Sequence, residues 1–565
     1  NFMNSTEWII IFLVFQIIYF LSTWKLFIKA GEKPIYSLIP FYNLIIMMKI
    51  IKRPKWWFIL LFIPVINLLM AGVIIIETLR SFGKNSNLDT LIGLVSLGTY
   101  ITYINYFGSI DYVKDRDVTN KTWIGEFIHS LVFAVVAATI VHNYFIQPYI
   151  IPTGSLEKTL LIGDFLFVSK FHYGARVPTT PIAFPMVHDT IPIIKKRSYL
   201  KFPQLPYLRL PGFQKIKRNE IVVFSWPADT VRRFFVREKG VKKPIDKKSN
   251  YVKRCVGLPG DTLEIINGFV HIDNKKNILP DRAKVQFTYK LYNSNGISSI
   301  KLIQNNIENF SRKFKINNIS QSIYNSIKNE IIGVISNDSN NFIVLTNSSG
   351  FPKDLIREFG INAVELLEKS KDLTLSISEY ENLKKLNLFD SISQQVYGNK
   401  SYLNTFPNDI SYKWSEDNFG PILIPEKGMK VKLTVENIFL YKKIIKDYEN
   451  NILSQIDNAF YINGIKSDTY TFKKDYYWMM GDNRHKSEDS RFWGFVPDDH
   501  IVGKPVLIWF SIKGINDGIK NWKIRWSRLM TTVKGEGKPI SFFPYFILSI
   551  ILWQIIVFVK KKKIK

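Results

Sequence analysis

Cysteine is almost absent from this chain: Cys255 is the only one among 565 residues. An intrachain disulfide and a metal site built from several cysteines are therefore excluded. The chain also lacks a glycine-rich phosphate loop and a His-Glu-x-x-His pair, so neither a nucleotide-binding protein nor a zinc peptidase is indicated. We expect no metal and no cofactor.

Acidic residues are scarce: 47 Asp and Glu stand against 76 Lys and Arg, which gives a formal charge of +29. An excess of this size raises the alternative of a nucleic-acid partner. However, 46% of the residues are hydrophobic and 15% are aromatic, and many basic residues lie beside apolar runs. This mixture is typical of membrane segments joined to a soluble part. We therefore expect a lipid bilayer as a partner and no nucleic acid.

Long runs without charge are plentiful. Spanning helices are predicted at Trp8 to Trp24, Trp56 to Ile76, Phe127 to Ile146 and Phe542 to Val559, with Leu91 to Phe107 as a weaker candidate. The first run has no basic region before it and no small-residue cleavage site after it. We therefore expect a span there and not a cleavable signal peptide.

Basic loops orient these spans. The segments Lys25 to Lys55 and Asp111 to Lys121, together with the tail after Val559, are basic and should face the cytoplasm. The loop Glu77 to Asp89 has few basic residues and should lie outside. Five spans with the N-terminus outside and the C-terminus inside satisfy all of these counts. The chain from Gln147 to about Ser541 is then extracytoplasmic.

Two apolar segments are too short or too irregular to span. Tyr36 to Met48 predicts an interfacial helix. Arg176 to Phe213 is rich in proline and carries Phe, Met and Leu residues that we expect to be exposed. Two interpretations stay open for it: shallow contact with lipid headgroups, or a loop packed on the soluble domain by its prolines.

After Gln147 the pattern changes to short β-branched runs between turn signals, which predicts strands. Asn267-Gly268 and Asn463-Gly464 stand between such runs, as type I′ hairpins require. The predicted strands are Asp164 to Lys170, Glu220 to Phe224, Tyr251 to Gly257, Thr262 to Ile266 and Lys504 to Ile512. A large insertion, from Asp273 to about Lys466, mixes strands with helical stretches near Asp354 to Ser370.

The predicted fold is membrane-anchored and mainly β: an antiparallel β-domain with a large insertion, plus several transmembrane helices. The expected parts are an N-terminal membrane unit with about three spans (1–126), an anchor (127–147), the β-domain (148–268 and 472–512), the inserted region (269–471), a linker (513–540) and a C-terminal helix with a basic tail (541–565).

Three polar stretches stand out from this framework. "IPTGSLEKTL" carries Ser155, "YVKRCVGLPGD" carries Lys253, and "GDNRHKSEDSRFWGFVP" is a dense polar cluster. Alone, each has an ordinary explanation as a turn or a surface charge. In this order behind a membrane anchor, and with "RNEIVVF" between the first two, they closely resemble type I signal peptidase, the membrane-bound serine endopeptidase that removes signal peptides from exported proteins. The resemblance covers roughly Phe127 to Gly268 and Phe472 to Ile512.

The resemblance implies a role for individual residues. Ser155 aligns with the nucleophile and Lys253 with its general base. Thr153 stands where the family usually has a serine whose hydroxyl joins the Ser155 N–H in the oxyanion hole. Ser487 aligns with the serine that orients the lysine.

Further positions carry implied supporting roles. Asp489 and Arg491 align with a buried pair, and His485 departs from the Asp that is common after Gly-Asp-Asn-Arg. The resemblance also implies structural support of the site by Asp482, Arg484 and Arg254. Pockets for small substrate side chains are implied at Ile151, Pro152, Leu156 and Val252.

Elementary chemistry supports such a pair independently. A serine hydroxyl is a poor nucleophile unless a base takes its proton, and a solvated lysine with a pKa near ~10.4 cannot accept one at neutral pH. Burial among apolar neighbours lowers that pKa. Tyr251, Val252, Cys255 and Val256 flank Lys253, and strand alternation should point Lys253 and Arg254 in opposite directions.

The expected function is cleavage of preproteins after Ala-x-Ala-like sites at the outer face of a bacterial cytoplasmic membrane. The alternatives are a self-cleaving Ser/Lys repressor, a nucleic-acid binder, and a non-catalytic membrane receptor or assembly factor on the same scaffold. Three roles are open for the N-terminal unit: docking of the secretion translocon, assistance in anchoring, or simple tethering.

Overall fold

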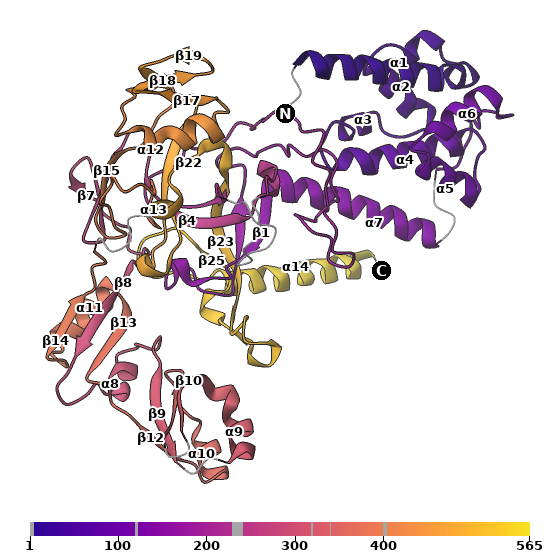
Figure 1. The fold of residues 1–565 in the computed structure, drawn as a ribbon. Helices are drawn as coiled ribbons and strands as arrows, with labels where there is room; N and C mark the ends of the chain where they lie inside the picture. The colour runs from indigo at the N-terminus through magenta and orange to yellow at the C-terminus, as the bar shows by residue number, and fades with distance from the viewer. Residues whose placement is uncertain are drawn as a thin grey trace.

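The chain folds into a helical part, a β-domain and an insertion that projects from the β-domain (Figure 1). The computed structural model describes residues 5–118, 123–228, 241–317, 320–338, 341–398 and 404–564. The predicted basic loop Asp111 to Lys121 lies partly outside the described residues.

One antiparallel sheet forms the centre of the β-domain, in the order β1-β2-β23-β3-β4-β21-β22, with β24 and β25 also paired to β23. Its strands are β1 (Ile146–Ile150), β2 (Asp164–Ser169), β3 (Ile221–Ser225), β4 (Asn250–Gly257), β21 (Tyr476–Met480), β22 (Val496–Pro497), β23 (Ile501–Lys513), β24 (Lys523–Ile524) and β25 (Thr531–Thr532). Four of the predicted strands are thus confirmed here. Within the predicted linker 513–540, β24 and β25 belong to this sheet.

A second antiparallel sheet, in the order β15-β5-β6-β7, packs beside the first through a shared apolar core. Its strands are β5 (Thr262–Ile266), β6 (Phe269–Ile272), β7 (Lys275–Lys276) and β15 (Phe419–Leu423). The fifth predicted strand is β5. Asn267 and Gly268 join β5 to β6 with φ of 48° and 83°, as a type I′ turn requires, so this predicted hairpin is confirmed.

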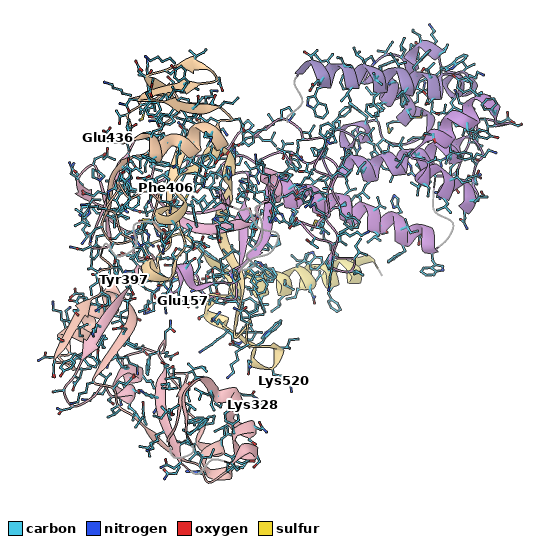
Figure 2. All side chains as sticks on the ribbon, viewed as in Figure 1. Glu157, Lys328, Tyr397, Phe406, Glu436 and Lys520 are labelled. Atoms are coloured by element: carbon cyan, nitrogen blue, oxygen red, sulfur yellow. The ribbon has the colours of Figure 1, made fainter. Side chains whose placement is uncertain are left out.

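The insertion forms small sheets of its own and a pair of lobes, one of which reaches far from the β-domain. Figure 2 labels Tyr397 at the junction with the β-domain and Lys328 on the outermost lobe. The sheet orders are β13-β8-β14, β10-β11-β9-β12, β16-β20 and β17-β18-β19. Asn463 and Gly464, with φ of 53° and 83°, make the second predicted hairpin, between β18 and β19.

The elements of the insertion are short. The strands are β8 (Gln286–Tyr292), β9 (Arg312–Asn317), β10 (Ile331–Asp338), β11 (Asn341–Thr346), β12 (Asn362–Glu365), β13 (Ser370–Ser376), β14 (Ser391–Gln394), β16 (Lys430–Lys432), β17 (Leu453–Ile456), β18 (Ala459–Ile462), β19 (Ile465–Lys466) and β20 (Thr469–Thr471); the helices are α8 (Ser299–Gln304), α9 (Gln321–Ile327), α10 (Lys353–Glu358), α11 (Ile377–Lys385) and α12 (Ile438–Lys443). The helical stretch predicted near Asp354 to Ser370 is wrong beyond α10, because the chain turns into β12.

Three described helices are long and apolar enough to cross a membrane: α1 (Ser5–Lys29), α7 (Trp123–Ile140, continued by a π-helical turn to Phe145) and α14 (Phe543–Ile564). They confirm the predicted spans at Trp8 to Trp24, Phe127 to Ile146 and Phe542 to Val559. The protein is a membrane protein. Strand β1 continues directly from α7, so the central sheet begins where this helix ends.

The predicted continuous span Trp56 to Ile76 is wrong. The chain forms a single turn, α3 (Trp57–Leu60), and resumes helix only at α4 (Ile66–Ser81). Pro64 has no N–H to donate, and Val65 adopts a left-handed φ of 74°. The break points toward the Pro-rich loop, since the Val65 N–H donates to the Pro181 carbonyl at 3.2 Å.

The weaker candidate Leu91 to Phe107 is also wrong as a span. It divides into α5 (Asn87–Val95) and α6 (Thr99–Phe107), separated by Leu97 and Gly98 with φ of 51° and 90°. Each helix has nine residues, about 14 Å at 1.5 Å per residue, against a hydrocarbon core of about 30 Å.

The predicted interfacial helix Tyr36 to Met48 is only partly helical. A 3₁₀ turn, Pro34–Ser37, precedes α2 (Tyr42–Ile50). Met47 and Met48 of α2 are buried in the core that α1, α4 and α6 share. The helix therefore packs inside the N-terminal unit and does not lie apart on a bilayer surface.

Glu77 near the end of α4 holds this unit together. Its carboxylate, 6% exposed, pairs with Arg53 at 3.1 Å and also with Arg116. These three residues come from segments that precede α3, end α4 and lead to α7. The pairings fix the half-length helices against each other.

We expect Glu77→Gln to destabilise the N-terminal unit by about 3–5 kcal/mol, because it leaves two largely buried guanidinium groups without their carboxylate. Hydrogen exchange of α4 and α5 in detergent measures the loss of protection. Glu32→Gln is the matched control, since Glu32 forms an ion pair with the exposed Lys49 and such pairs contribute about 1 kcal/mol or less. Equal exchange in the two variants would contradict the assignment.

Candidate active site

Ser155 lies in the loop that joins β1 to β2, on a 3₁₀ turn (Gly154–Leu156). The base of this loop is closed by two hydrogen bonds: the Ile151 N–H donates to the Asp164 carbonyl at 2.9 Å, and the Gly163 N–H donates to the Ile151 carbonyl at 2.8 Å. Ser155 is half-buried and Thr153 is exposed. This segment therefore lies at the surface of the domain.

Lys253 lies on β4, between β3 and β21, and is only 3% exposed. It pairs with Val222 of β3, and its amine lies 5.5 Å from the centre of the Tyr251 ring. Burial lowers the pKa of Lys253 to about 8, against the opposing attraction of Asp489 and Glu488. An amine with this pKa is partly neutral near neutral pH, as a general base requires.

Arg254 points to the other face of β4, where its guanidinium is held by three hydrogen bonds. Its guanidinium forms two hydrogen bonds to Asp482, at 2.7 and 2.6 Å, and a third to the Asn219 carbonyl. Thr159 Oγ1, four residues after Ser155, donates to the same Asp482 at 2.6 Å. Asp482 thus ties the lysine strand to the serine loop.

A second buried pair lies on the Lys253 side. Asp489 and Arg491 are both 0% exposed, and the guanidinium binds the carboxylate through Nε and Nη2 at 2.9 Å each. Asp489 also accepts hydrogen bonds from Ser487 Oγ at 2.9 Å and from the Gly481 N–H at 3.0 Å. Ser487 is therefore fixed in orientation beside the charges that act on Lys253.

Asn483 joins this cluster to the serine loop. Its N–H donates to the Ser155 carbonyl at 3.0 Å, and its side-chain amide donates to the Gly154 carbonyl at 3.1 Å. Gly481 makes a close approach here, because a Cβ on it would collide with the Ser487 hydroxyl and lie 2.7 Å from the Ser155 carbonyl oxygen. The structure thus brings all three polar stretches together.

The residues with implied substrate contacts fall into two groups: Ile151, Leu156 and Val252 form an apolar floor, and Pro152 is exposed at its edge. Ile151 and Leu156 are 4% and 1% exposed and belong to one apolar cluster, against which Val252 packs. Pro152 is exposed, and its carbonyl accepts a hydrogen bond from Asn516 at 3.3 Å. The apolar floor lies directly beneath the Thr153–Ser155 segment.

Arg484 is buried and donates to the Gly268 carbonyl at 3.2 Å. Its own carbonyl accepts from Arg491 at 2.6 Å. Arg484 therefore connects the site to the β5–β6 hairpin.

His485, where the sequence departs from the family pattern, has a partner in the insertion. Its Nδ1 accepts the Thr288 N–H at 3.1 Å, so its Nε2 is the donor to Asp417, at 2.9 Å. Asp417 is fully buried. Sequence reasoning missed this partner because the insertion has no motif that marks Asp417.

The insertion also contacts the serine loop directly. The Gln286 N–H at the start of β8 donates to the Asp482 carbonyl at 2.8 Å, and the Gln286 amide donates to the Glu157 carbonyl. Lys158 forms an ion pair with Glu379, which completes the capping box of α11 with Ser376. Neither contact was predicted, since no local signal joins positions so far apart in the chain.

No group of three or more His, Cys, Asp or Glu side chains is placed to hold a metal ion within the described part of the chain. The arrangement instead provides a serine loop, a buried amine and two buried acid–base pairs. Such a set is suited to acyl transfer by an activated serine.

Comparison with known proteins agrees with this class. A family model described as "Signal peptidase, peptidase S26" matches residues 124–316 and 422–510. The chain belongs to this family. A model described as "Family of unknown function (DUF5684)" matches residues 35–115, within the helical unit.

The chain is also similar to proteins named "Signal peptidase I". The protein of Buchnera aphidicola subsp. Acyrthosiphon pisum is 25% identical over 398 residues, covering 69% of this chain and 77% of the relative. That of Buchnera aphidicola subsp. Baizongia pistaciae is 24% identical over 373 residues, covering 66% and 72%. That of Rickettsia typhi is 29% identical over 163 residues, covering 29% and 48%.

We expect Lys253→Met to raise the melting temperature at pH 6, because the substitution removes a charge that is buried at a penalty of roughly 3 kcal/mol. The folded-state pKa of about 8 lies below the unfolded one. The penalty is therefore complete below pH 8 and disappears as the pH approaches ~10.4. Thermal melts of Lys253→Met, wild type and the exposed-lysine control Lys290→Met between pH 6 and 10 measure this. A variant less stable than wild type at pH 6 would contradict a desolvated amine.

Proposed function

We propose that the protein is a type I signal peptidase, a membrane-bound serine endopeptidase that cleaves preproteins after small residues, with Ser155 as nucleophile and Lys253 as general base. The observation that carries the proposal is the buried Lys253 amine, whose pKa is about 8. The amine lies beside the Ser487–Asp489–Arg491 cluster, in which Asp489 accepts hydrogen bonds from Ser487 and from the Gly481 N–H. Asn483, from the same segment, donates its N–H to the Ser155 carbonyl and so joins the cluster to the serine loop.

The catalytic steps follow from these groups. The neutral Lys253 amine takes the proton of the Ser155 hydroxyl as Oγ attacks the scissile carbonyl carbon. The Ser155 N–H and the Thr153 hydroxyl donate to the resulting oxyanion. The Lys253 ammonium then gives its proton to the leaving amine. In the second half of the reaction the neutral Lys253 amine takes a proton from a water that attacks the acyl carbon, and it returns this proton to Ser155 Oγ as the acyl–Oγ bond breaks. Ser487 holds the amine in the direction of Ser155.

The substrate enters as an extended segment beside Pro152 and Thr153, with backbone hydrogen bonds of the kind that an added strand makes. The floor of Ile151, Leu156 and Val252 is almost filled by its own packing. It accommodates alanine-sized side chains and excludes larger ones. This agrees with cleavage at Ala-x-Ala-like sites.

The membrane arrangement supports an outward-facing site. The two breaks in the N-terminal unit remove two predicted spans, so both chain ends keep their predicted sides: N-terminus outside, C-terminus inside. With three spans, the segment between α1 and α7 begins and ends on the cytoplasmic side, and its break at Val65 reaches back to the extracytoplasmic Pro-rich loop. The loop Glu77 to Asp89, predicted outside, is then cytoplasmic, and residues between α7 and α14 are extracytoplasmic. Since the named relatives are bacterial, the proposed location is the cytoplasmic membrane of a bacterium.

The apolar side chains of the Pro-rich loop favour lipid contact among its two interpretations. Ile193, Phe202 and Phe213 are 92%, 61% and 83% exposed. Exposed apolar side chains of this kind are suited to the headgroup region of the outer leaflet. The bilayer and preproteins are therefore the proposed partners.

The test uses purified full-length protein in detergent and a radiolabelled precursor with an Ala-x-Ala site. We expect wild type and the exposed-lysine control Lys290→Ala to release the mature form. Ser155→Ala should abolish release, and Lys253→Ala should lower the rate by about 10² to 10⁴, the usual contribution of a general base. The kcat/KM of wild type should fall about tenfold for each pH unit below about 8, as the amine becomes protonated. Precursor processing by Ser155→Ala would overturn the proposal.

Thr153 provides a separate test of the oxyanion hole. Thr153→Ser keeps the hydroxyl and should cleave at nearly the wild-type rate. Thr153→Val keeps the shape and removes the donor, so kcat should fall by about 10² to 10³. Steady-state kinetics of the two variants on the same precursor measure the difference, and equal rates would refute the role of Thr153.

A further inference from the structure

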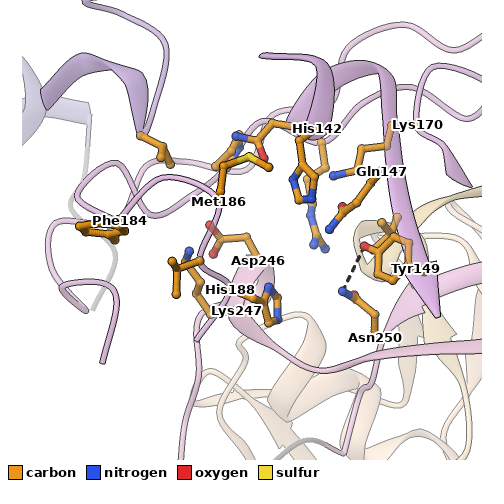
Figure 3. A pocket seen from close by; sticks show the side chains of 16 residues that line it. His142, Gln147, Tyr149, Lys170, Phe184, Met186, His188, Asp246, Lys247 and Asn250 are labelled. Carbon is orange, nitrogen blue, oxygen red and sulfur yellow. Dashed lines mark hydrogen bonds between the residues drawn. The ribbon is translucent and has the colours of Figure 1, made fainter. Parts of the chain in front are cut away.

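A pocket of about 210 Å³ lies where the chain leaves α7 and enters the β-domain. Its walls come from the end of α7, the ends of β1 and β2, the Pro-rich loop and the segment before β4. Figure 3 shows His142, Gln147 and Lys170 directed into one space. This pocket takes no part in the chemistry proposed for Ser155.

The level of the pocket relative to the bilayer is set by one hydrogen bond. The Lys170 N–H donates to the Phe145 carbonyl at 2.8 Å, and Phe145 is the last residue of the candidate span Gly125–Phe145. Lys170 therefore lies where the hydrocarbon core ends. The polar layer of a bilayer begins there and is about 5–8 Å thick on each side.

Neither Lys170 nor Arg176 forms an ion pair with another described residue, although Asp246 attracts Arg176 from the pocket wall. Burial lowers the pKa of Lys170 to about 7, and the positive charge of Arg176 nearby adds to this shift. Arg176 donates to neutral acceptors, the Asp499 carbonyl and Ser225 Oγ, both at 3.1 Å. Among the described residues, none accepts a hydrogen bond from the Lys170 amine.

The one carboxylate in the wall is already engaged. Asp246 accepts hydrogen bonds from the hydroxyls of Thr179 and Thr180 and from the Thr180 N–H, at 2.8 to 3.1 Å. The adjacent Lys247 adds a third, buried cation to the lining. The pocket therefore presents a net positive charge to whatever occupies it.

Desolvated cations of like charge are favourable only when an anion joins them. A phosphate group suits this pocket, because its oxygens can accept from an ammonium and a guanidinium at once. The volume is smaller than the roughly 300 Å³ at which pockets for whole small molecules begin, so it admits a headgroup and not a complete lipid. Phe184 and Met186, 56% and 51% exposed at its lining, offer apolar contact for acyl chains.

We propose that this pocket binds the phosphate of a membrane phospholipid, with Lys170 and Arg176 as the phosphate ligands and Phe184 and Met186 against the acyl chains. The bound lipid lies between the end of α7, the Pro-rich loop and the break at Val65, which also lines the pocket. Binding is independent of peptidase activity, so its test stands apart from the function proposed for Ser155.

The experiment measures lipid binding to the full chain in neutral detergent micelles by native mass spectrometry. Dioleoylphosphatidylglycerol is the probe, diolein is the phosphate-free control, and inorganic phosphate is a third arm. We expect phosphatidylglycerol to bind wild type, Lys170→Gln to weaken its Kd about tenfold, as loss of one charge-assisted hydrogen bond predicts, and Lys170→Arg to restore it. Lys196→Gln, an exposed lysine of the same loop, should leave the Kd unchanged.

The outcomes separate the sources of the phosphate. Weak or absent binding of diolein and of inorganic phosphate supports a lipid site. Inorganic phosphate binding as tightly as the lipid assigns the pocket to a free anion and overturns the lipid assignment. An equal Kd for Lys170→Gln and Lys196→Gln overturns the site itself. Lys170→Gln should melt no lower than wild type without lipid, because it removes a desolvated charge; a lower melting temperature would contradict the unpartnered amine.

Discussion

The removal of one amine from water is the constraint on which the site depends. Lys253 is on an interior strand, and its pKa results from a balance between burial, which lowers it, and Asp489, which raises it. Arg491 offsets most of the negative charge of the Asp489 carboxylate, to which it donates two hydrogen bonds. An unpaired Asp489 would return the amine to its charged form. The buried Asp489–Arg491 pair therefore helps to set the pKa of Lys253.

Much of the β-domain could be predicted from the sequence because its signals are local. β-branched runs with turn residues between them gave the strands, and Asn267-Gly268 gave a hairpin, since both residues adopt positive φ. Strand alternation also indicated that Lys253 and Arg254 would point to opposite faces, and Arg254 binds Asp482 on the face away from the Tyr251 ring.

The N-terminal unit was predicted less well because hydropathy measures composition and not backbone path. The run Trp56 to Ile76 is apolar enough to span, but Pro64 and the left-handed Val65 divide it. Pro64 was the signal in the sequence that could have indicated this helix break. Leu97 and Gly98 divide the next run in the same way. The partners of His485 and Asp482 in the insertion could not be predicted, because single-sequence patterns carry no information about pairing between distant segments.

The dependence of the site on β8 limits how the protein can be shortened. Gln286 is the first residue of a strand that belongs to the insertion, but it supplies hydrogen bonds to the carbonyls of Asp482 and Glu157. Asp417, from the far end of the same insertion, holds His485. Trimming the inserted lobes to leave a minimal β-domain would remove the hydrogen-bond partners that Gln286 and Asp417 supply around the Ser155 loop and the Asp482–Arg491 segment.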